Sequence, residues 1–139
     1  YKGTKMPRIL KHIDQIAREK NRDVLFVAFD NEIYEGYDYE EWVSRTQLIQ
    51  WLESHKISYI ECFHIANENY MESYRGEIYI DVAYDENNPT YIQVKDYLEN
   101  SDGSPRIPGV LFYLLPSEIA MKNKHHDEPG FWDKWAENF

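Results

Sequence analysis

The sequence predicts an α/β (α+β) protein in which helices cover a central four-stranded mixed sheet. Residues 24–29 and 110–115 are continuous apolar runs of strand length, the pattern of strands buried on both faces. A helical segment, two strand-like segments and a second helical segment lie between these runs. The order α-β-α-β-β-α-β, followed by a short C-terminal helix, therefore predicts a single-domain sandwich of two or three layers.

The first two helices are predicted from the spacing of apolar side chains and from capping residues. Residues 7–20 place their apolar side chains along one helical face and carry basic residues near the end. Ser44 and Gln47 match a capping box, so a second helix is expected to begin there and to end at His55. A start nearer Asp38 is the alternative.

The segment after residue 87 admits two interpretations. Asn88 and Pro89 are a favourable N-cap and first helical residue, so we expect a helix that continues to residue 98. A strand over residues 90–98, paired as a hairpin with the preceding strand, is the competing interpretation. Short helices are also expected after Pro116 and within residues 131–139.

Residues 58–65 and 77–84 are the two remaining strand candidates. Apolar and polar side chains alternate in the second of them, which predicts one solvent-exposed face. The runs 24–29 and 110–115 are the most apolar and are expected to lie side by side at the centre of the sheet. This part of the order resembles the split βαβ, ferredoxin-like arrangement. A thioredoxin-like sheet is the alternative, although the chain has no Cys-x-x-Cys motif.

Length and composition indicate one domain, which we expect to span residues 7–139. Residues 1–6 are predicted to be disordered, or an addition to a native chain that starts at Met6. Cys62 is the only cysteine, so an internal disulfide is excluded and a reducing, cytoplasmic location is favoured. No apolar run approaches the roughly 18–20 residues of a membrane span, and we predict no membrane partner.

The charge of the chain is strongly uneven. The net charge is −10, yet residues 1–22 contain seven basic and two acidic side chains. The remainder is so acidic that direct binding of nucleic acid through it is disfavoured. The basic N-terminal region leaves open contact with an anion or, in a homo-oligomer, with the acidic body of a second copy.

Residues 30–42 are the most distinctive segment of the sequence. Six of these thirteen residues are acidic, four are large aromatic residues, and none is Lys or Arg. Carboxylates attract a cationic partner over long range, and aromatic rings supply contact area, so we expect a recognition surface. The alternative is that the rings pack on the sheet edge and the acids are merely solvated. The predicted binding residues are Glu32, Tyr34, Glu35, Tyr37, Asp38, Tyr39, Glu40 and Glu41.

A complete catalytic motif is absent from the sequence, and we predict no catalytic residue and no cofactor. The metal-ligand candidates are His125, His126 and Asp127 in the run that ends at Glu128, together with the distant His64. Adjacent side chains point in different directions along a helix or a strand, which favours a solvated turn over a metal site.

Two functional hypotheses from different classes follow. The first is a small acidic, non-enzymatic protein that binds a basic protein, such as an inhibitor or immunity-type protein of a nuclease or another nucleic-acid-binding effector. In charge alone the composition is similar to that of bacterial immunity proteins and phage DNA mimics. The alternative is a small metal-dependent hydrolase that uses the His125–Glu128 region, with His64 and Asp81 as further ligands.

Overall fold

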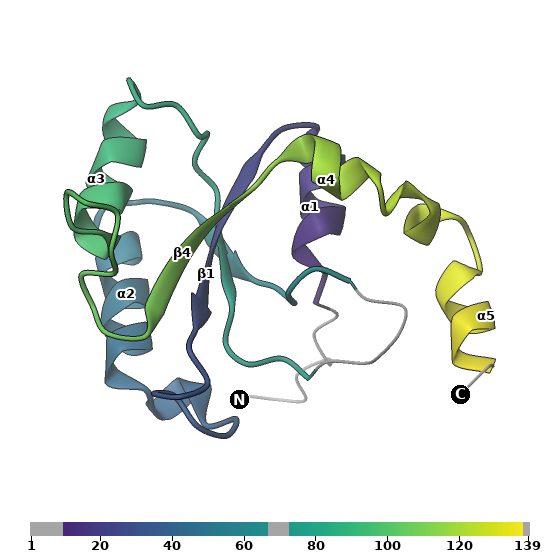
Figure 1. Ribbon diagram of the computed structural model, residues 1–139, viewed down its shortest axis with the longest axis horizontal. Helices are drawn as coiled ribbons and strands as arrows, with labels where there is room; N and C mark the ends of the chain where they lie inside the picture. Colours follow the sequence, from purple (N-terminus) through teal and green to yellow (C-terminus); the bar gives the residue numbers. More distant parts are fainter. Residues whose placement is uncertain (1–9, 67–72, 138–139) are drawn as a thin grey trace.

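The computed structural model of the protein describes residues 10–66 and 73–137, and its helices and strands form three layers (Figure 1). The prediction for residues 1–6 lies outside the described residues. In chain order the elements are α1 (Ile13–Lys20), β1 (Val24–Phe29), the 3-10 turn η1 (Tyr39–Glu41), α2 (Val43–Ser54), β2 (Tyr59–Glu61), β3 (Ile78–Ile80), α3 (Pro89–Leu98), β4 (Val110–Leu115), α4 (Ser117–Met121), the 3-10 turn η2 (Lys124–Asp127) and α5 (Phe131–Glu137).

The four strands form one sheet in the order β2-β3-β1-β4. Each neighbouring pair is antiparallel, so the expectation of a mixed sheet is wrong. β1 and β2 run parallel but are separated by β3, because α2 carries the chain over one face and β3 then enters between them. This is the predicted split βαβ arrangement. β1 and β4 are neighbours, as predicted, but β4 lies at an edge of the sheet and not at its centre.

β1 belongs to two hydrophobic cores, one on each face of the sheet. Leu25, Val27 and Phe29 point toward α2 and α3, where they join a core with residues of those helices. The alternate residues Val24 and Phe26 join a second core on the side of α1 and α4. Figure 1 shows the two pairs of helices on opposite sides of the β1–β4 pair. The apolar run of β1 is therefore buried on both faces, as its sequence predicted.

The two shorter strands differ from their predicted form. Ile78, Tyr79 and Ile80 are all buried, so the solvent-exposed face expected for β3 is wrong, because Tyr79 lies in the core beneath α1. β2 covers only three residues of the predicted segment 58–65. The following Phe63 instead pairs with the chain just before α1, where it accepts a backbone hydrogen bond from Ile13.

The helices mostly follow their sequence signals. The Asn88 side chain accepts a hydrogen bond of 2.8 Å from the Thr90 N–H at the start of α3, which confirms the helix over the competing strand. α2 begins at Val43 after Trp42 as N-cap, so the predicted capping box at Ser44 is not formed. The preceding chain is already coiled as η1, because its backbone groups bond to one another from Asp38 onward.

A buried carboxylate joins α1 to the segments around it. Asp14 is fully buried and accepts hydrogen bonds from the Asn123 amide at 2.8 Å, the Arg18 guanidinium at 3.0 Å and the Ala66 N–H at 3.1 Å. Arg18 in turn donates two hydrogen bonds of 2.7 Å to Asp127. Burial by itself would raise the pKa of Asp14, but the three hydrogen bonds outweigh it and hold this pKa below its usual 3.8.

Replacing Asp14 with alanine is expected to lower the free energy of unfolding at neutral pH by about 3 kcal/mol, because Arg18 and Asn123 lose a buried partner. The stabilisation from ionised Asp14 is fully present above the pKa of 3.8 that the group has in the unfolded chain. It is lost as the pH falls through the lower pKa that Asp14 has in the folded protein. Urea unfolding at several pH values is therefore expected to show that the difference in unfolding free energy between Asp14→Ala and wild type becomes smaller in acid. The exposed control Asp96→Ala changes stability by less than about 0.5 kcal/mol. A pH-independent difference would contradict this account.

Candidate functional site

The acidic segment forms the loop between β1 and α2, which lies at the lower end of the sheet in Figure 1. We call residues 30–42 the acidic loop. It begins at Asp30, whose N–H donates to the Gly109 carbonyl at 2.9 Å and so extends the β1–β4 ladder by one residue. The Asp30 carboxylate accepts the Glu32 N–H at 2.8 Å, which fixes the first turn of the loop.

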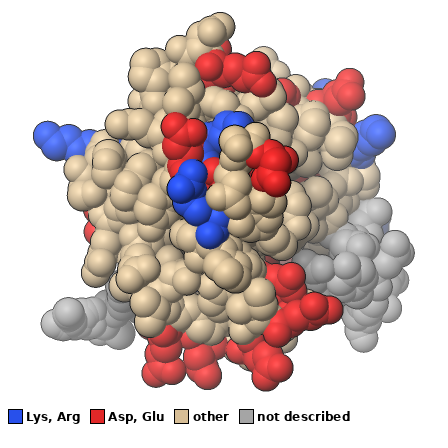
Figure 2. Space-filling model, turned by 60° about the vertical axis from the view of Figure 1, so that its left-hand side comes forward, with Lys and Arg blue, Asp and Glu red and all other residues tan. Residues whose placement is uncertain are grey.

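The carboxylates of the acidic loop have no cationic partner within the described part of the chain. Asp30 is half-buried, and the other five acidic side chains are exposed. The ion pairs of the described residues involve none of the six. Figure 2 shows acidic side chains gathered along the lower end of the molecule, where this loop lies. Within the described part of the chain, the loop therefore presents to solvent negative charge that no ion pair neutralises.

The basic side chains between residues 10 and 22, in contrast, all form ion pairs with acidic side chains. Lys11 pairs with Glu19 at 2.7 Å, and Arg18 binds Asp14 and Asp127. Lys20 and Arg22 both approach Asp81, at 3.6 and 2.7 Å. All the basic residues between positions 10 and 22 are thus neutralised by carboxylates of the same chain.

The aromatic side chains of the acidic loop divide into inner and outer sets. Tyr34 packs on Phe29 and Trp42, and its hydroxyl donates to the Pro108 carbonyl at 3.3 Å. Tyr39 likewise lies against the core side of the loop, while Tyr37 is 60% exposed. Of the three predicted tyrosines, only Tyr37 presents most of its ring to solvent.

Two arginines that sequence reasoning missed hold the loop in place. The Arg75 guanidinium donates to the Tyr34 and Gly36 carbonyls and lies 5.9 Å from the ring centres of Tyr37 and Trp42. These contacts use backbone carbonyls and rings, not carboxylates. Arg75 thus fixes the loop without forming an ion pair with its acids, and no pattern in the sequence around it indicated this role.

Arg45 of α2 supports the same loop from beneath. It is 4% exposed, donates to the Gly76 carbonyl at 2.9 Å and to the Tyr74 hydroxyl at 2.8 Å, and lies over the Tyr39 ring. Burial raises the pKa of Tyr74 far above its usual 10, so the hydroxyl keeps its proton and donates it to the Glu77 carbonyl at 3.1 Å.

A glycine is required where the loop meets the start of β4. Gly109 has a φ of +80°, and a Cβ there would lie 2.8 Å from the Tyr34 ring and 3.0 Å from the side chain of Ile33. Both the backbone conformation and the close approach exclude a larger residue without movement of the loop. The loop is therefore packed directly against the β1–β4 pair.

An open groove of about 710 Å³ lies beside the acidic loop. Its floor is the part of the β1–β4 pair that α1 and α4 leave uncovered, and its rim carries acidic side chains. One cation, Arg75, lies among the lining residues. These are Ala28, Phe29, Asp30, Asn31, Glu32, Tyr37, His64, Ser73, Arg75, Glu77, Leu111 and Tyr113.

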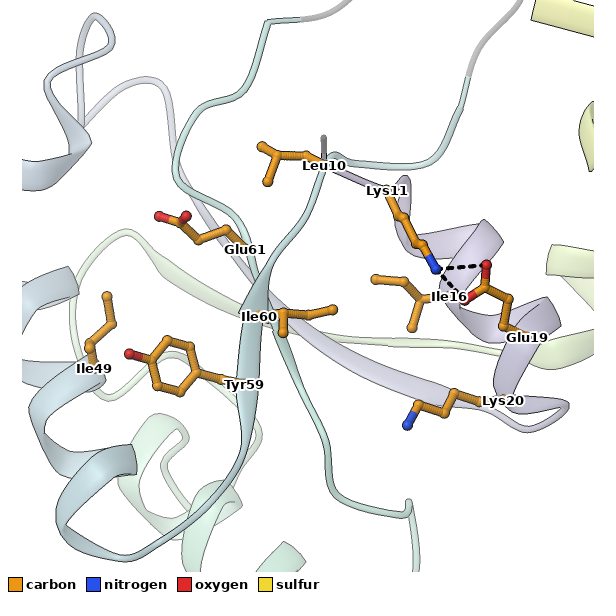
Figure 3. Close-up of a pocket in the computed structure, with 9 residues that line it drawn as sticks. All are labelled: Leu10, Lys11, Ile16, Glu19, Lys20, Ile49, Tyr59, Ile60 and Glu61. Atoms are coloured by element: carbon orange, nitrogen blue, oxygen red, sulfur yellow. Dashed lines mark hydrogen bonds and ion pairs between the residues drawn. The ribbon is translucent and has the colours of Figure 1, made fainter. Parts of the chain in front are cut away.

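A second groove of about 560 Å³ lies between α1, α2 and the free edge of β2 (Figure 3). Ile16 and Ile60 approach it from opposite sides, and the Lys11–Glu19 ion pair closes one end. The lining contains two lysines, Lys11 and Lys20, and two glutamates, Glu19 and Glu61, so this groove has no net charge.

The structure does not assemble the predicted metal ligands. Asp127 is held by Arg18, and His126 is buried against Phe131 and Trp132. His64 packs on Phe26 and lines the groove beside the acidic loop. Among residues 10–66 and 73–137, no three His, Cys, Asp or Glu side chains are grouped as a metal ion requires.

Comparison with known proteins gives no match among family models, curated proteins or solved structures. None of the helices in the described part of the chain has both the length and the apolar character needed to cross a membrane.

Arg75→Ala is expected to loosen the acidic loop, because the Tyr34 and Gly36 carbonyls lose their donor. Amide hydrogen exchange across residues 32–41 then becomes about tenfold faster or more, while exchange in β1 changes little. Arg106→Ala is the matched control, since Arg106 is exposed and reaches only the Glu99 carbonyl at 3.4 Å. Unchanged exchange in Arg75→Ala would show that the loop is held by other contacts.

Proposed function

We propose that the protein is a non-enzymatic binding protein that recognises a basic protein through its acidic loop. The observation that carries the proposal is the set of six carboxylates without an ion pair within the described residues. The loop that carries them is held by Arg75 at its backbone and by Arg45 at the Tyr39 ring. A surface already held in one conformation loses little entropy on binding. Its charge accelerates the encounter with a cationic surface.

The contact surface consists of charges at the rim and a few apolar groups within it. Tyr37 is the aromatic anchor, because its ring is exposed beside Arg75 and also lines the groove. Glu40 and Glu41 extend the acidic rim toward α2. Buried aromatic anchors within a charged rim are typical of interfaces in which a few residues supply most of the affinity.

The more specific form of the proposal is an inhibitor or immunity-type protein that covers a nuclease or another nucleic-acid-binding effector. Such effectors carry basic surfaces that bind phosphates, and an acidic loop competes for the same cations. A reducing, cytoplasmic location is part of the proposal, and the buried free thiol of Cys62 supports it. No comparable observation supports the alternative of a metal-dependent hydrolase, because its candidate metal ligands pack against aromatic rings or form ion pairs.

Capture from a lysate of the source cells tests the proposal. Wild-type protein is expected to retain basic proteins, of pI above about 9, at about 50 mM salt and to release most of them at about 500 mM. Charge reversal of Glu40 and Glu41 to lysine is expected to weaken capture strongly, because the six carboxylates of the acidic loop become four carboxylates and two cations, and the charge of the loop changes from −6 to −2. The matched control reverses Asp85 and Glu86, an exposed acidic pair remote from the loop in the sequence. Mass spectrometry identifies the retained proteins.

Two results would contradict the proposal. Capture that is indifferent to salt shows that charge does not drive recognition. Equal loss of capture in the control pair shows that net charge, and not the acidic loop, is responsible.

A further inference from the structure

The outer edge of β4 is an apolar strand edge at which Phe112 and Leu114 have no backbone partner in the described part of the chain. The register of β4 on β1 is continuous over six residue pairs. Hydrogen-bonded pairs alternate along an antiparallel ladder, and Asp30 with Gly109 is one of them. Phe112 and Leu114 therefore direct their N–H and C=O groups away from β1. No backbone partner for these groups occurs in the described part of the chain.

This edge lacks the features that normally keep an exposed strand from pairing. Residues 110–115 contain no charged residue and no proline, and the ladder has no bulge. Tyr113 is 42% exposed on one face of the strand, and Leu114 is 36% exposed on the other. Apolar side chains accessible to an added strand thus adjoin the outward backbone groups of Phe112 and Leu114.

The groove beside the acidic loop continues this edge on one face of the sheet. Leu111 and Tyr113 form its apolar side, and Asp30 and Glu32 stand at the end where β4 begins. A strand laid along β4 would direct every second side chain into this groove. Side chains near the Gly109 end would meet the two carboxylates.

We propose that an extended segment of the basic partner pairs with the outer edge of β4 and places a lysine or arginine against Asp30 and Glu32. The segment adds a fifth strand to the sheet, with main-chain hydrogen bonds to Phe112 and Leu114. Its alternate apolar side chains cover Leu111 and Tyr113. This inference rests on the proposed function, because it takes the partner to be basic.

Charge distinguishes this occupant from a second copy of the chain. Another copy has the same net charge of −10, and its own β4 contains no basic residue to meet Asp30 and Glu32. Pairing of two β4 edges would therefore leave the carboxylates unpaired and bring together two acidic molecules. A cationic strand satisfies both the backbone groups and the carboxylates.

The test uses the full chain and labelled, end-blocked peptides of about nine residues in which threonine and valine alternate. Two lysines occupy one end, the N-terminal end in one peptide and the C-terminal end in another, because either strand direction fits the edge. The comparison peptides carry glutamate in place of lysine, or carry no charge, or have N-methyl groups on alternate backbone amides. Fluorescence anisotropy gives the affinities, and amide exchange reports on Phe112 and Leu114.

A lysine peptide is expected to bind and to slow amide exchange at Phe112 and Leu114. N-methylation weakens binding about tenfold or more, because the added strand loses its donors. Leu114→Pro removes an outward N–H and also weakens binding about tenfold, whereas the matched Leu114→Ala retains that N–H and binds within about threefold of wild type. Asp30→Asn combined with Glu32→Gln weakens the lysine peptide about threefold and leaves the uncharged peptide unchanged.

Three outcomes overturn the inference. Equal binding of the N-methylated peptide excludes strand pairing, even if Leu114→Pro does not fold. Failure of both lysine peptides to bind, with salt-sensitive capture of a basic partner intact, removes strand addition while the proposed function stands. A wild-type dimer in sedimentation that Leu114→Pro converts into a monomer assigns the edge to a second copy.

Discussion

The whole structure depends on the burial of β1 between two layers of helices. Leu25 and Val27 enter one core, and Val24 and Phe26 enter the other, so both layers are organised around a single strand. The antiparallel ladder with β4 continues beyond β1 to Asp30. That last hydrogen bond fixes the point at which the acidic loop leaves the sheet. The position of the proposed recognition surface therefore follows from how the core is built.

Charge is used in two distinct ways along the chain. Arg18 of α1 pairs with Asp127, and Lys20 and Arg22 pair with Asp81, so these ion pairs join segments distant in sequence. Around the acidic loop, Arg75 binds carbonyl groups and faces aromatic rings. The backbone of the loop is held while its carboxylates stay exposed. Carboxylates without an ion pair among the described residues repel one another, and the cationic partner that we propose would relieve this repulsion.

Patterns local in sequence predicted much of the fold but less of the site. The apolar run of β1 and the Asn88 cap are local signals, and both structures formed. The polar face of β3 was misjudged because Tyr79 becomes buried only when α1 packs over it. The inward position of Tyr34 depends on the close approach of Gly109. The role of Arg75 depends on the irregular segment before β3, which is distant from the acidic loop in sequence but contacts it in space. Contacts of this kind have no periodicity that a sequence reveals.

The rate at which the protein associates with its captured basic partner, measured by stopped-flow over a range of salt concentrations, tests the central claim most directly. If the unpaired carboxylates of the acidic loop guide the encounter, the association rate constant falls about tenfold or more between about 50 and 500 mM salt, while the dissociation rate constant changes much less. An association rate constant that does not depend on salt would contradict the account, because exposed charge would then contribute nothing to recognition.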